Sequence, residues 1–503
     1  MQLSRNILSK LDAEKIAVPA ESLFALPEKV LQFGTGVLLR GLPDHFIDKA
    51  NKQNIFNGRI VVVKSTSTGG ADTFNEQDGL YTLLEKGFVN GVQCEKTVIN
   101  ASISRVVSAN DEWETILKCA ANPNMQIILS NTTEVGIALV ESDAHTVKPV
   151  SFPGRVLCFL LERYRVFNGS SDSGIVIIPT ELIVDNGTKL KQIVVTLAKL
   201  KGESGLFLHW LENDNDFCNS LVDCIVPGKL PVAEQSVAEN KLGYEDELMI
   251  MSEPYRLWAI ETKSERTKSI LSFSKVDNSV LLAPDINKFR ELKLRLLNGT
   301  HTLSCGLAHL SGFSTVKEAM RDEYFVTYIS NLMLQEIVPL VAQGNCTTEE
   351  AQQFASQVID RFKNPYIEHL WLNITVQYTS KMVMRTVPLV EKHYEQNTTA
   401  PELMALGFAA FLLFMRSEKK ADSQFYGSCN SKEYRIQDDK ASLVYDKWQS
   451  GEIENSLQDT NIFGADLSRF PGFAEAVNRW LELLERSGAV NTLRSILAKK
   501  SVA

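Results

Sequence analysis

Long apolar runs are missing from this sequence. The longest, Leu403–Met415, falls short of the roughly 20 residues that a membrane-spanning helix needs, so it predicts a buried core helix instead. The start of the chain mixes acidic and basic residues and lacks the apolar stretch of a secretion signal. We therefore expect a cytoplasmic protein with no membrane partner.

Metal-binding and redox cysteine motifs are also missing. The eight cysteines are scattered, with no Cys-x-x-Cys pair and no zinc-type spacing to histidine, which favours reduced thiols and no metal.

Basic charge is not in excess either. The formal net charge of −9 argues against a nucleic-acid partner, because a phosphate backbone requires a clustered basic surface. A small anionic substrate stays compatible, since a pocket can be locally positive inside an acidic protein.

What the chain does contain is the composition of a folded enzyme, with 44% hydrophobic and 22% charged residues over 503 positions. In the first half, short β-branched runs alternate with helical stretches. Continuous apolar runs of this length are typical of parallel strands that helices cover on both faces. The sequence therefore predicts strands at Val30–Phe33, Ile60–Val63, Ile127–Ser130 and Ile175–Ile178.

The second half loses these strand signals. Amphipathic segments around residues 286–310, 316–342, 348–363, 400–416 and 468–487 predict helices, and Thr347 and Glu350 have the spacing of a capping box. We expect an α/β Rossmann-type domain over residues 1–280. An all-α substrate and catalytic domain should follow over residues 281–503.

The end of the first predicted strand resembles a dinucleotide-binding turn. Gly34, Thr35 and Gly36 follow it directly, where backbone N–H groups could approach a pyrophosphate, and Arg40 lies just beyond. Leu39 replaces the third glycine of the usual fingerprint. These residues predict a nicotinamide dinucleotide site.

A second polar turn follows the strand Ile127–Ser130. It contains Asn131, Thr132, Thr133 and Glu134 at the carboxyl edge, where α/β proteins bind ligands. The second predicted strand closes on Lys64 and Ser65, without the acid that grips the ribose in NAD proteins. We expect NAD, with NADP left open.

One predicted helical segment of the second half contains three candidate catalytic residues. Lys293, Asn298 and His301 can line one broad face of an α-helix that is otherwise rich in leucine. Singly, each has an ordinary structural explanation. Together they supply a proton donor, an oxyanion donor and an orienting group.

On these residues the sequence resembles the mannitol dehydrogenase family, whose signature is Lys, four residues, Asn, two residues and His. Matching motifs run in order along almost the whole chain. They are Gly34–Arg40, Gln77–Thr82, Ser130–Glu134, Ser151–Gly154, Leu221–Pro227, Glu253 and Pro254 with Trp258, and Arg361–Pro365.

The resemblance implies a site in a cleft between the two domains, with Lys293, Asn298 and His301 catalytic and Asp223 and Lys381 at the substrate. It is strongest to the uronate branch, which implies reduction of tagaturonate or fructuronate. A uronate needs a cationic partner, for which Lys381 is the first choice, helped by Arg361 or Arg385.

Two departures from the polyol members concern the substrate. Leu182 replaces their second active-site asparagine, and Asn373 replaces their arginine. A dehydrogenase of a neutral polyol such as mannitol is the first alternative, and a non-catalytic sugar-acid sensor on the same scaffold is the second.

Overall fold

The computed structural model describes residues 1–12, 16–65, 71–133, 135–419 and 424–498. Contacts divide the chain into two compact units. The first is Met1–Lys86 with Gln93–Ile286, and the second is Gly87–Val92 with Asn287–Ala503. The main division follows Ile286, whereas the sequence analysis placed it after residue 280.

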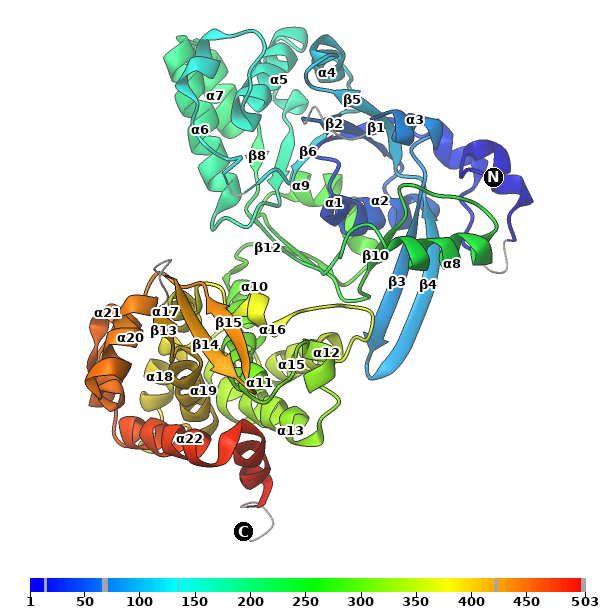
Figure 1. Cartoon of the computed structure of the whole chain (residues 1–503). Coiled ribbons are helices and arrows are strands. Elements are labelled where there is room, and N and C mark those ends of the chain that lie inside the picture. Colours follow the sequence, from blue (N-terminus) through cyan, green and yellow to red (C-terminus); the bar gives the residue numbers. More distant parts are fainter. Residues whose placement is uncertain (13–15, 66–70, 134, 420–423, 499–503) are drawn as a thin grey trace. The chain divides into compact units, whose positions relative to one another are not determined.

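A parallel sheet forms the centre of the first unit (Figure 1), in the order β5-β2-β1-β6-β7-β8. Its strands are β1 (Glu28–Phe33), β2 (Arg59–Lys64), β5 (Ile103–Ser108), β6 (Ile127–Ser130), β7 (Val176–Pro179) and β8 (Asp216–Phe217). The four predicted strands correspond to β1, β2, β6 and β7, and their pairing is parallel throughout. The α/β prediction is confirmed.

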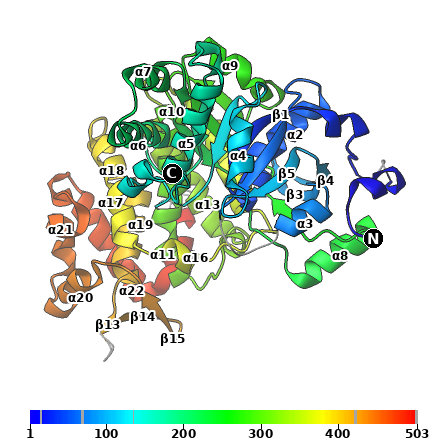
Figure 2. The same cartoon turned by 90° about the horizontal axis from the view of Figure 1, so that it is seen from above.

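Both faces of this sheet are buried, as the β-branched runs predict. Val61 and Val63 of β2 pack with the helices α4 to α7, whereas Ile60 and Val62 pack with α2 on the opposite face. Figures 1 and 2 both show α5, α6 and α7 grouped together. The helices of this unit are α1 (Val37–Gly41), α2 (Pro43–Lys52), α3 (Ala71–Glu76), α4 (Trp113–Ala120), α5 (Phe152–Val166), α6 (Asn186–Lys201), α7 (Gly205–Asn213), α8 (Val232–Leu242) and α9 (Glu265–Ile270).

Two small sheets complete the strands of the first half. One has the order β10-β3-β4 and the other β12-β11-β9. Their strands are β3 (Tyr81–Val89), β4 (Val92–Asn100), β9 (Ser220–Asp223), β10 (Ile250–Ser252), β11 (Leu257–Glu261) and β12 (Val280–Ala283). The second of these sheets fixes the position of Asp223, because Asp223 pairs with Leu257 of β11.

The second unit is helical. Its α-helices are α10 (Asn287–Leu292), α11 (Thr300–Leu310), α12 (Val316–Ala319), α13 (Glu323–Asn331), α14 (Val338–Val341), α15 (Thr348–Phe362), α16 (Trp371–Ile374), α17 (Tyr378–Arg385), α18 (Val387–Tyr394), α19 (Glu402–Phe414), α20 (Ala441–Ser450), α21 (Thr460–Phe463) and α22 (Phe473–Ala498). Two π-helices, η6 (Lys293–Gly299) and η7 (Leu332–Ile337), interrupt the series. The capping box at Thr347 is present in full.

Helix α19 forms the core of this unit, as predicted for the longest apolar run. It approaches α11 closely at glycines. A Cβ on Gly407 would lie 2.8 Å from the Leu303 carbonyl oxygen, and a Cβ on Gly306 would lie 3.0 Å from that of Ala410. Larger residues would push the two helices apart, so these glycines fix the position of α11. Within the described residues, no helix is long and apolar enough to cross a membrane.

A small antiparallel sheet in this unit was not predicted. It contains β13 (Glu418–Lys419), β14 (Phe425–Cys429) and β15 (Lys432–Ile436), which lie together in Figures 1 and 2. Asn430 and Ser431 connect β14 to β15 with positive φ angles of 50° and 61°, as in a tight two-residue hairpin turn. The second half is thus helical with one added hairpin sheet.

Asp44 of α2 gives the first unit a testable dependence on pH. Its side chain is fully buried and its Oδ1 has no hydrogen-bond partner among the described residues. Burial raises the pKa of Asp44 to about 8. The folded chain therefore keeps this proton over a pH range in which the unfolded chain, with its ordinary carboxyl pKa, has lost it.

We expect Asp44→Asn to gain thermal stability relative to wild type as the pH rises from 5 to 8, because the loss of free energy of unfolding that comes from Asp44 occurs only in wild type. Each kcal/mol should appear as about 2 to 4 °C in the melting temperature. Melting curves of both proteins at several pH values measure this. A constant difference in melting temperature between the two proteins across that range would contradict the raised pKa of Asp44.

Candidate active site

The predicted catalytic segment is not a continuous α-helix. Lys293–Gly299 forms the π-helix η6 between α10 and α11. The α-helical spacing assumed from the sequence is therefore wrong for these residues. A turn closed by i→i+5 hydrogen bonds contains more residues than an α-helical turn, so Asn298 lies nearer to the side of Lys293 than α-helical spacing gives. His301 follows three residues later in α11. Both Lys293 and Asn298 are partly buried.

His301 lies in a tightly packed aromatic setting. It is 8% exposed, stacks on Phe362 with ring centroids 4.1 Å apart, and meets His369 and Trp371 edge-on at 5.1 and 6.0 Å. Its Nε2 has no hydrogen-bond partner among the described residues. A buried polar atom of this kind needs an explanation, and a bound ligand is one.

The charges around His301 are predominantly positive. Burial holds the pKa of His301 well below its ordinary value, and His369, Arg361, Arg385 and Lys381 lower it further. His301 is therefore a neutral imidazole near pH 7. Such a group can orient a hydroxyl or carbonyl by hydrogen bonding without acting as an acid, and this role of His301 stays a prediction.

Three cationic side chains reach this region from two helices. Arg361 lies in the last turn of α15, next to Phe362, and is buried. Lys381 and Arg385 lie on α17, where the Lys381 Nζ donates to the Ile374 carbonyl oxygen at 2.8 Å. Arg385 was named in the sequence analysis only as a helper. The fold thus gathers around His301 cations that are far apart in the sequence.

The predicted cofactor turn lies at the carboxyl end of β1. Gly34 has φ +128°, and a Cβ there would lie 3.0 Å from Leu39 Cδ1 and 3.2 Å from the Asn131 carbonyl oxygen, so glycine is required. Gly36 is exposed, and a Cβ on it would meet nothing within 4 Å. Backbone beside this turn, including Thr35, is therefore accessible to a ligand.

The neighbouring turn after β6 is organised by an acid that the sequence analysis did not select. Glu181 is 3% exposed, and its carboxylate accepts hydrogen bonds from Ser130 Oγ and from the backbone N–H and Oγ1 of Thr132. Asn131 Nδ2 donates to Thr180 Oγ1 at 3.0 Å, whereas Thr133 is exposed. Glu134 lies outside the described residues. Glu181 thus fixes the shape of the predicted cofactor loop.

The remaining predicted residues of the first unit differ in their surroundings. Arg40 is buried, donates to the Leu248 carbonyl oxygen, and lies 5.3 Å from the centre of the Tyr81 ring. These contacts are within the protein core, and its contact with a cofactor stays a prediction. Asp223 ends β9 and is 8% exposed. Leu182, in the place of the polyol enzymes' asparagine, is 63% exposed.

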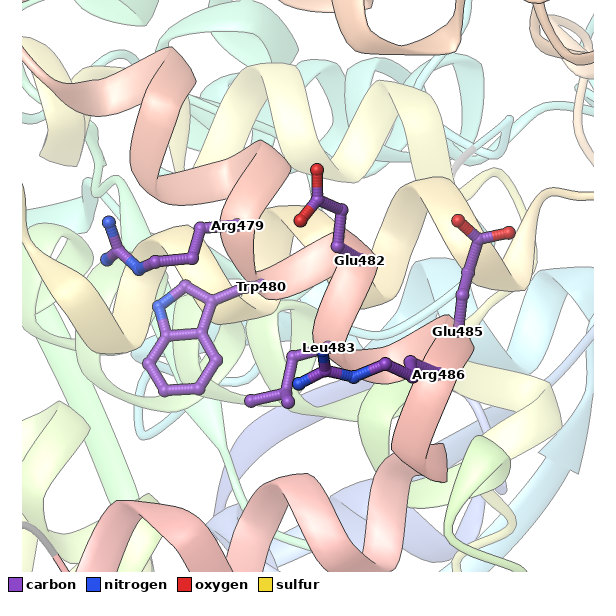
Figure 3. A pocket seen from close by; sticks show the side chains of 6 residues that line it. All are labelled: Arg479, Trp480, Glu482, Leu483, Glu485 and Arg486. Carbon is purple, nitrogen blue, oxygen red and sulfur yellow. The ribbon is translucent and has the colours of Figure 1, made fainter.

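A surface pocket elsewhere in the second unit contains none of the predicted site residues. Figure 3 shows its six labelled lining residues, all from the one helix α22: Arg479, Trp480, Glu482, Leu483, Glu485 and Arg486. Two of these charges are paired, Arg479 with Glu402 and Glu485 with Arg416. The pocket offers no acid–base constellation. Within the described part of the chain, no group of three or more His, Cys, Asp or Glu side chains could hold a metal ion.

Comparison with protein families gives two matches that follow each other along the chain. The model of the mannitol dehydrogenase Rossmann domain matches residues 28–271, and that of the mannitol dehydrogenase C-terminal domain matches residues 285–485. Together these matches include every residue predicted for the site.

Curated relatives match over nearly the full length. The chain is 35% identical over 485 residues to an altronate oxidoreductase of Halalkalibacterium halodurans, covering 94% of each protein. It is 35% identical over 477 residues to an altronate oxidoreductase of Bacillus subtilis, covering 93% of this chain and 95% of that protein.

Solved structures share the fold. Mannitol 2-dehydrogenase of Pseudomonas fluorescens, in a ternary complex with NAD and D-mannitol, gives a TM-score of 0.69 at 22% identity over 99% of this chain and 100% of that one. A substrate-free D-sorbitol dehydrogenase gives 0.76 at 19% identity, over 98% and 100%.

Proposed function

This chain belongs to the mannitol dehydrogenase family, and from that premise we propose that it interconverts tagaturonate and altronate with NAD. The observation that carries the choice of an acid substrate is the set of cations around His301, namely Arg361, Lys381 and Arg385. A uronate carboxylate in a partly desolvated pocket needs such a partner. The names of the full-length relatives point to the same substrate.

The residues of the first unit fit a dinucleotide. Gly34 and Gly36 leave room for a pyrophosphate at the end of β1, with Thr35 between them, and the loop of Asn131, Thr132 and Thr133 flanks the same sheet edge. Arg40 is proposed to support this turn from the core. When bound, NAD supplies the hydride acceptor or, in its reduced form, the hydride donor.

The residues of the second unit supply the proton and the orientation. In the reducing direction, the Lys293 ammonium donates a proton to the ketone oxygen, and the Asn298 amide donates a hydrogen bond that stabilises negative charge growing there. The neutral His301 orients the reacting oxygen through Nε2. Asp223 is proposed to bind substrate hydroxyls, and Arg361 and Lys381 to bind the acid end.

The closest rival is fructuronate as substrate, since the two keto acids differ in configuration at one carbon. Oxidation of NADH and of NADPH should be followed by absorbance with each keto acid in turn. We expect the highest kcat/KM for tagaturonate with NADH. Faster turnover of fructuronate would mean that the chain is a fructuronate reductase, and no turnover of either acid would refute the proposal.

The same assay decides between NAD and NADP, because the end of strand β2 carries no acid that would favour NAD. Strand β2 ends without an acid, and Ser65 just beyond it accepts a hydrogen bond from Arg155 at 2.8 Å. A preference for NADPH would indicate that Lys64 meets a 2′-phosphate. We propose NAD as the physiological cofactor and the cytoplasm as the location, where the eight free thiols stay reduced.

Removal of metal should leave activity unchanged, because the proposed acid is Lys293. We expect less than a twofold change in kcat after prolonged treatment with EDTA and gel filtration. Metal analysis of the protein before and after treatment completes the test. An activity that falls with the chelator and returns with one metal ion would replace Lys293 by a metal as the group that polarises the ketone.

A further inference from the structure

Two cations lie one turn apart on α17. Lys381 and Arg385 are spaced i, i+4, so they project from the same side of this helix. That side meets η6 and α11, the elements that carry Lys293, Asn298 and His301. The position of both cations is thus set by the same packing that sets the catalytic residues.

The hydrogen bonds of the two cations differ. Lys381 is a point charge whose Nζ already donates to the Ile374 carbonyl oxygen. Arg385 donates through Nη1 to Thr302 Oγ1 at 3.2 Å, and Thr302 Oγ1 donates in turn to the Asn298 carbonyl oxygen at 2.8 Å. Thr302 is fully buried and follows His301 directly. The Arg385 side chain is therefore fixed next to Asn298 and His301, two of the three residues proposed to act on the reacting oxygen.

Electrostatics at this position favour an anion. Burial lowers the pKa of Lys381 and so does Arg385, and burial also lowers the pKa of Arg385. His301 adds an unpartnered buried Nε2 beside them. Two neighbouring cations in a partly desolvated place repel each other, and a bound carboxylate would relieve that repulsion.

We propose that Arg385, held in place by Thr302, joins Arg361 and Lys381 at the substrate carboxylate and sets the preference for a sugar acid over a neutral sugar. Its planar fork can donate two parallel hydrogen bonds to a carboxylate, which Lys381 cannot do. Lys381 contributes charge from one turn away. This inference rests on the proposed keto-acid activity and assigns its specificity to one side chain.

The test compares tagaturonate with tagatose, the neutral ketose in which the carboxylate is a hydroxymethyl group. For Arg385→Met we expect KM for tagaturonate to rise about tenfold or more, because a charge-assisted pair is lost, while kcat/KM for tagatose stays within threefold. Lys381→Met should raise KM for tagaturonate by a smaller factor. An equal loss with both substrates would mean that Arg385 only ties α17 to α11, and would overturn the inference.

Two further variants separate binding from folding. Guanidinium ion added to Arg385→Ala should restore part of the tagaturonate activity and leave tagatose activity unchanged. Thr302→Val should raise KM for tagaturonate in the wild-type background, but have no effect in Arg385→Met, since Thr302 acts through Arg385. Rescue of both substrates alike, or additive effects of the two substitutions, would contradict the inference.

The outcomes distinguish this inference from the proposed function. If wild type reduces tagaturonate and Arg385→Met retains its KM, only the assignment of Arg385 fails. If wild type reduces neither keto acid, the proposed function fails and the carboxylate assignment fails with it.

Discussion

Lys293→Ala is expected to lower kcat for tagaturonate reduction by about a hundredfold or more, since a general acid contributes about 10² to 10⁴ in rate. Affinity for NADH should stay within a few-fold, because the dinucleotide turn at Gly34 and Gly36 belongs to the other unit. Steady-state kinetics gives the loss, and fluorescence titration with NADH gives the affinity.

A matched control for this variant is the lysine five residues earlier, in the preceding helix α10. Lys288 of α10 forms a partly exposed ion pair with Glu350 at 2.8 Å, a kind of pair that contributes little to stability. Lys288→Ala should keep wild-type kinetics. Retention of more than about a tenth of wild-type kcat by Lys293→Ala would remove Lys293 from the role of acid.

Asn298→Ala is expected to lower kcat by about 10² to 10³, the usual cost of losing one donor to a developing oxyanion. KM should change little, since the donor contributes mainly in the transition state. Asn298→Asp should be at least as impaired, because a carboxylate would repel the growing charge. The backbone carbonyl that Thr302 uses is kept in both variants.

Asn331→Ala is the control for Asn298→Ala. Asn331 precedes the second π-helix, η7, and its Oδ1 accepts a hydrogen bond from Gln335 Nε2 in that helix. The substitution should not alter kcat. If Asn298→Ala raises KM with kcat unchanged, Asn298 binds the ground state and the oxyanion role is wrong.

The layers of the first unit were predictable because the residue types of a strand indicate which of its faces are buried. Ile60–Val63 and its three counterparts are continuous β-branched runs, and only a sheet covered on both faces accommodates them. Thr347 and Glu350 likewise marked a helix start by local hydrogen-bonding chemistry that the structure reproduces.

The hairpin of β14 and β15 carried a weaker signal. Buried Tyr434 and Ile436 alternate with exposed Glu433 and Arg435, and Asn430 is a common turn residue, which together could have indicated it.

The shape of the catalytic segment was not predictable in the same way. Leucine periodicity shows which face of a helix is buried but does not distinguish an i→i+4 from an i→i+5 hydrogen-bond register, so η6 was missed. Glu181 was missed for another reason. Its role depends on its being buried against Ser130 and Thr132, which are distant in the sequence.

The cationic surroundings of His301 depend on tertiary packing as well. Lys381 was identified through the family resemblance, whereas the contact of Arg385 with Thr302 requires α17 to lie on α11. No sequence pattern encodes that contact. The proposed role of Arg385 in substrate specificity therefore depends on the structure more than on the sequence.

The most direct test is a single-turnover experiment in which the enzyme–NADH complex is mixed rapidly with a ketone substrate and the loss of NADH absorbance is followed. We expect fast loss with tagaturonate and, at equal concentration, loss at least about a hundredfold slower with fructose, the ketose of mannitol, since one charge-assisted pair gives roughly that discrimination. Equal or faster oxidation with fructose, or none with tagaturonate, would contradict it.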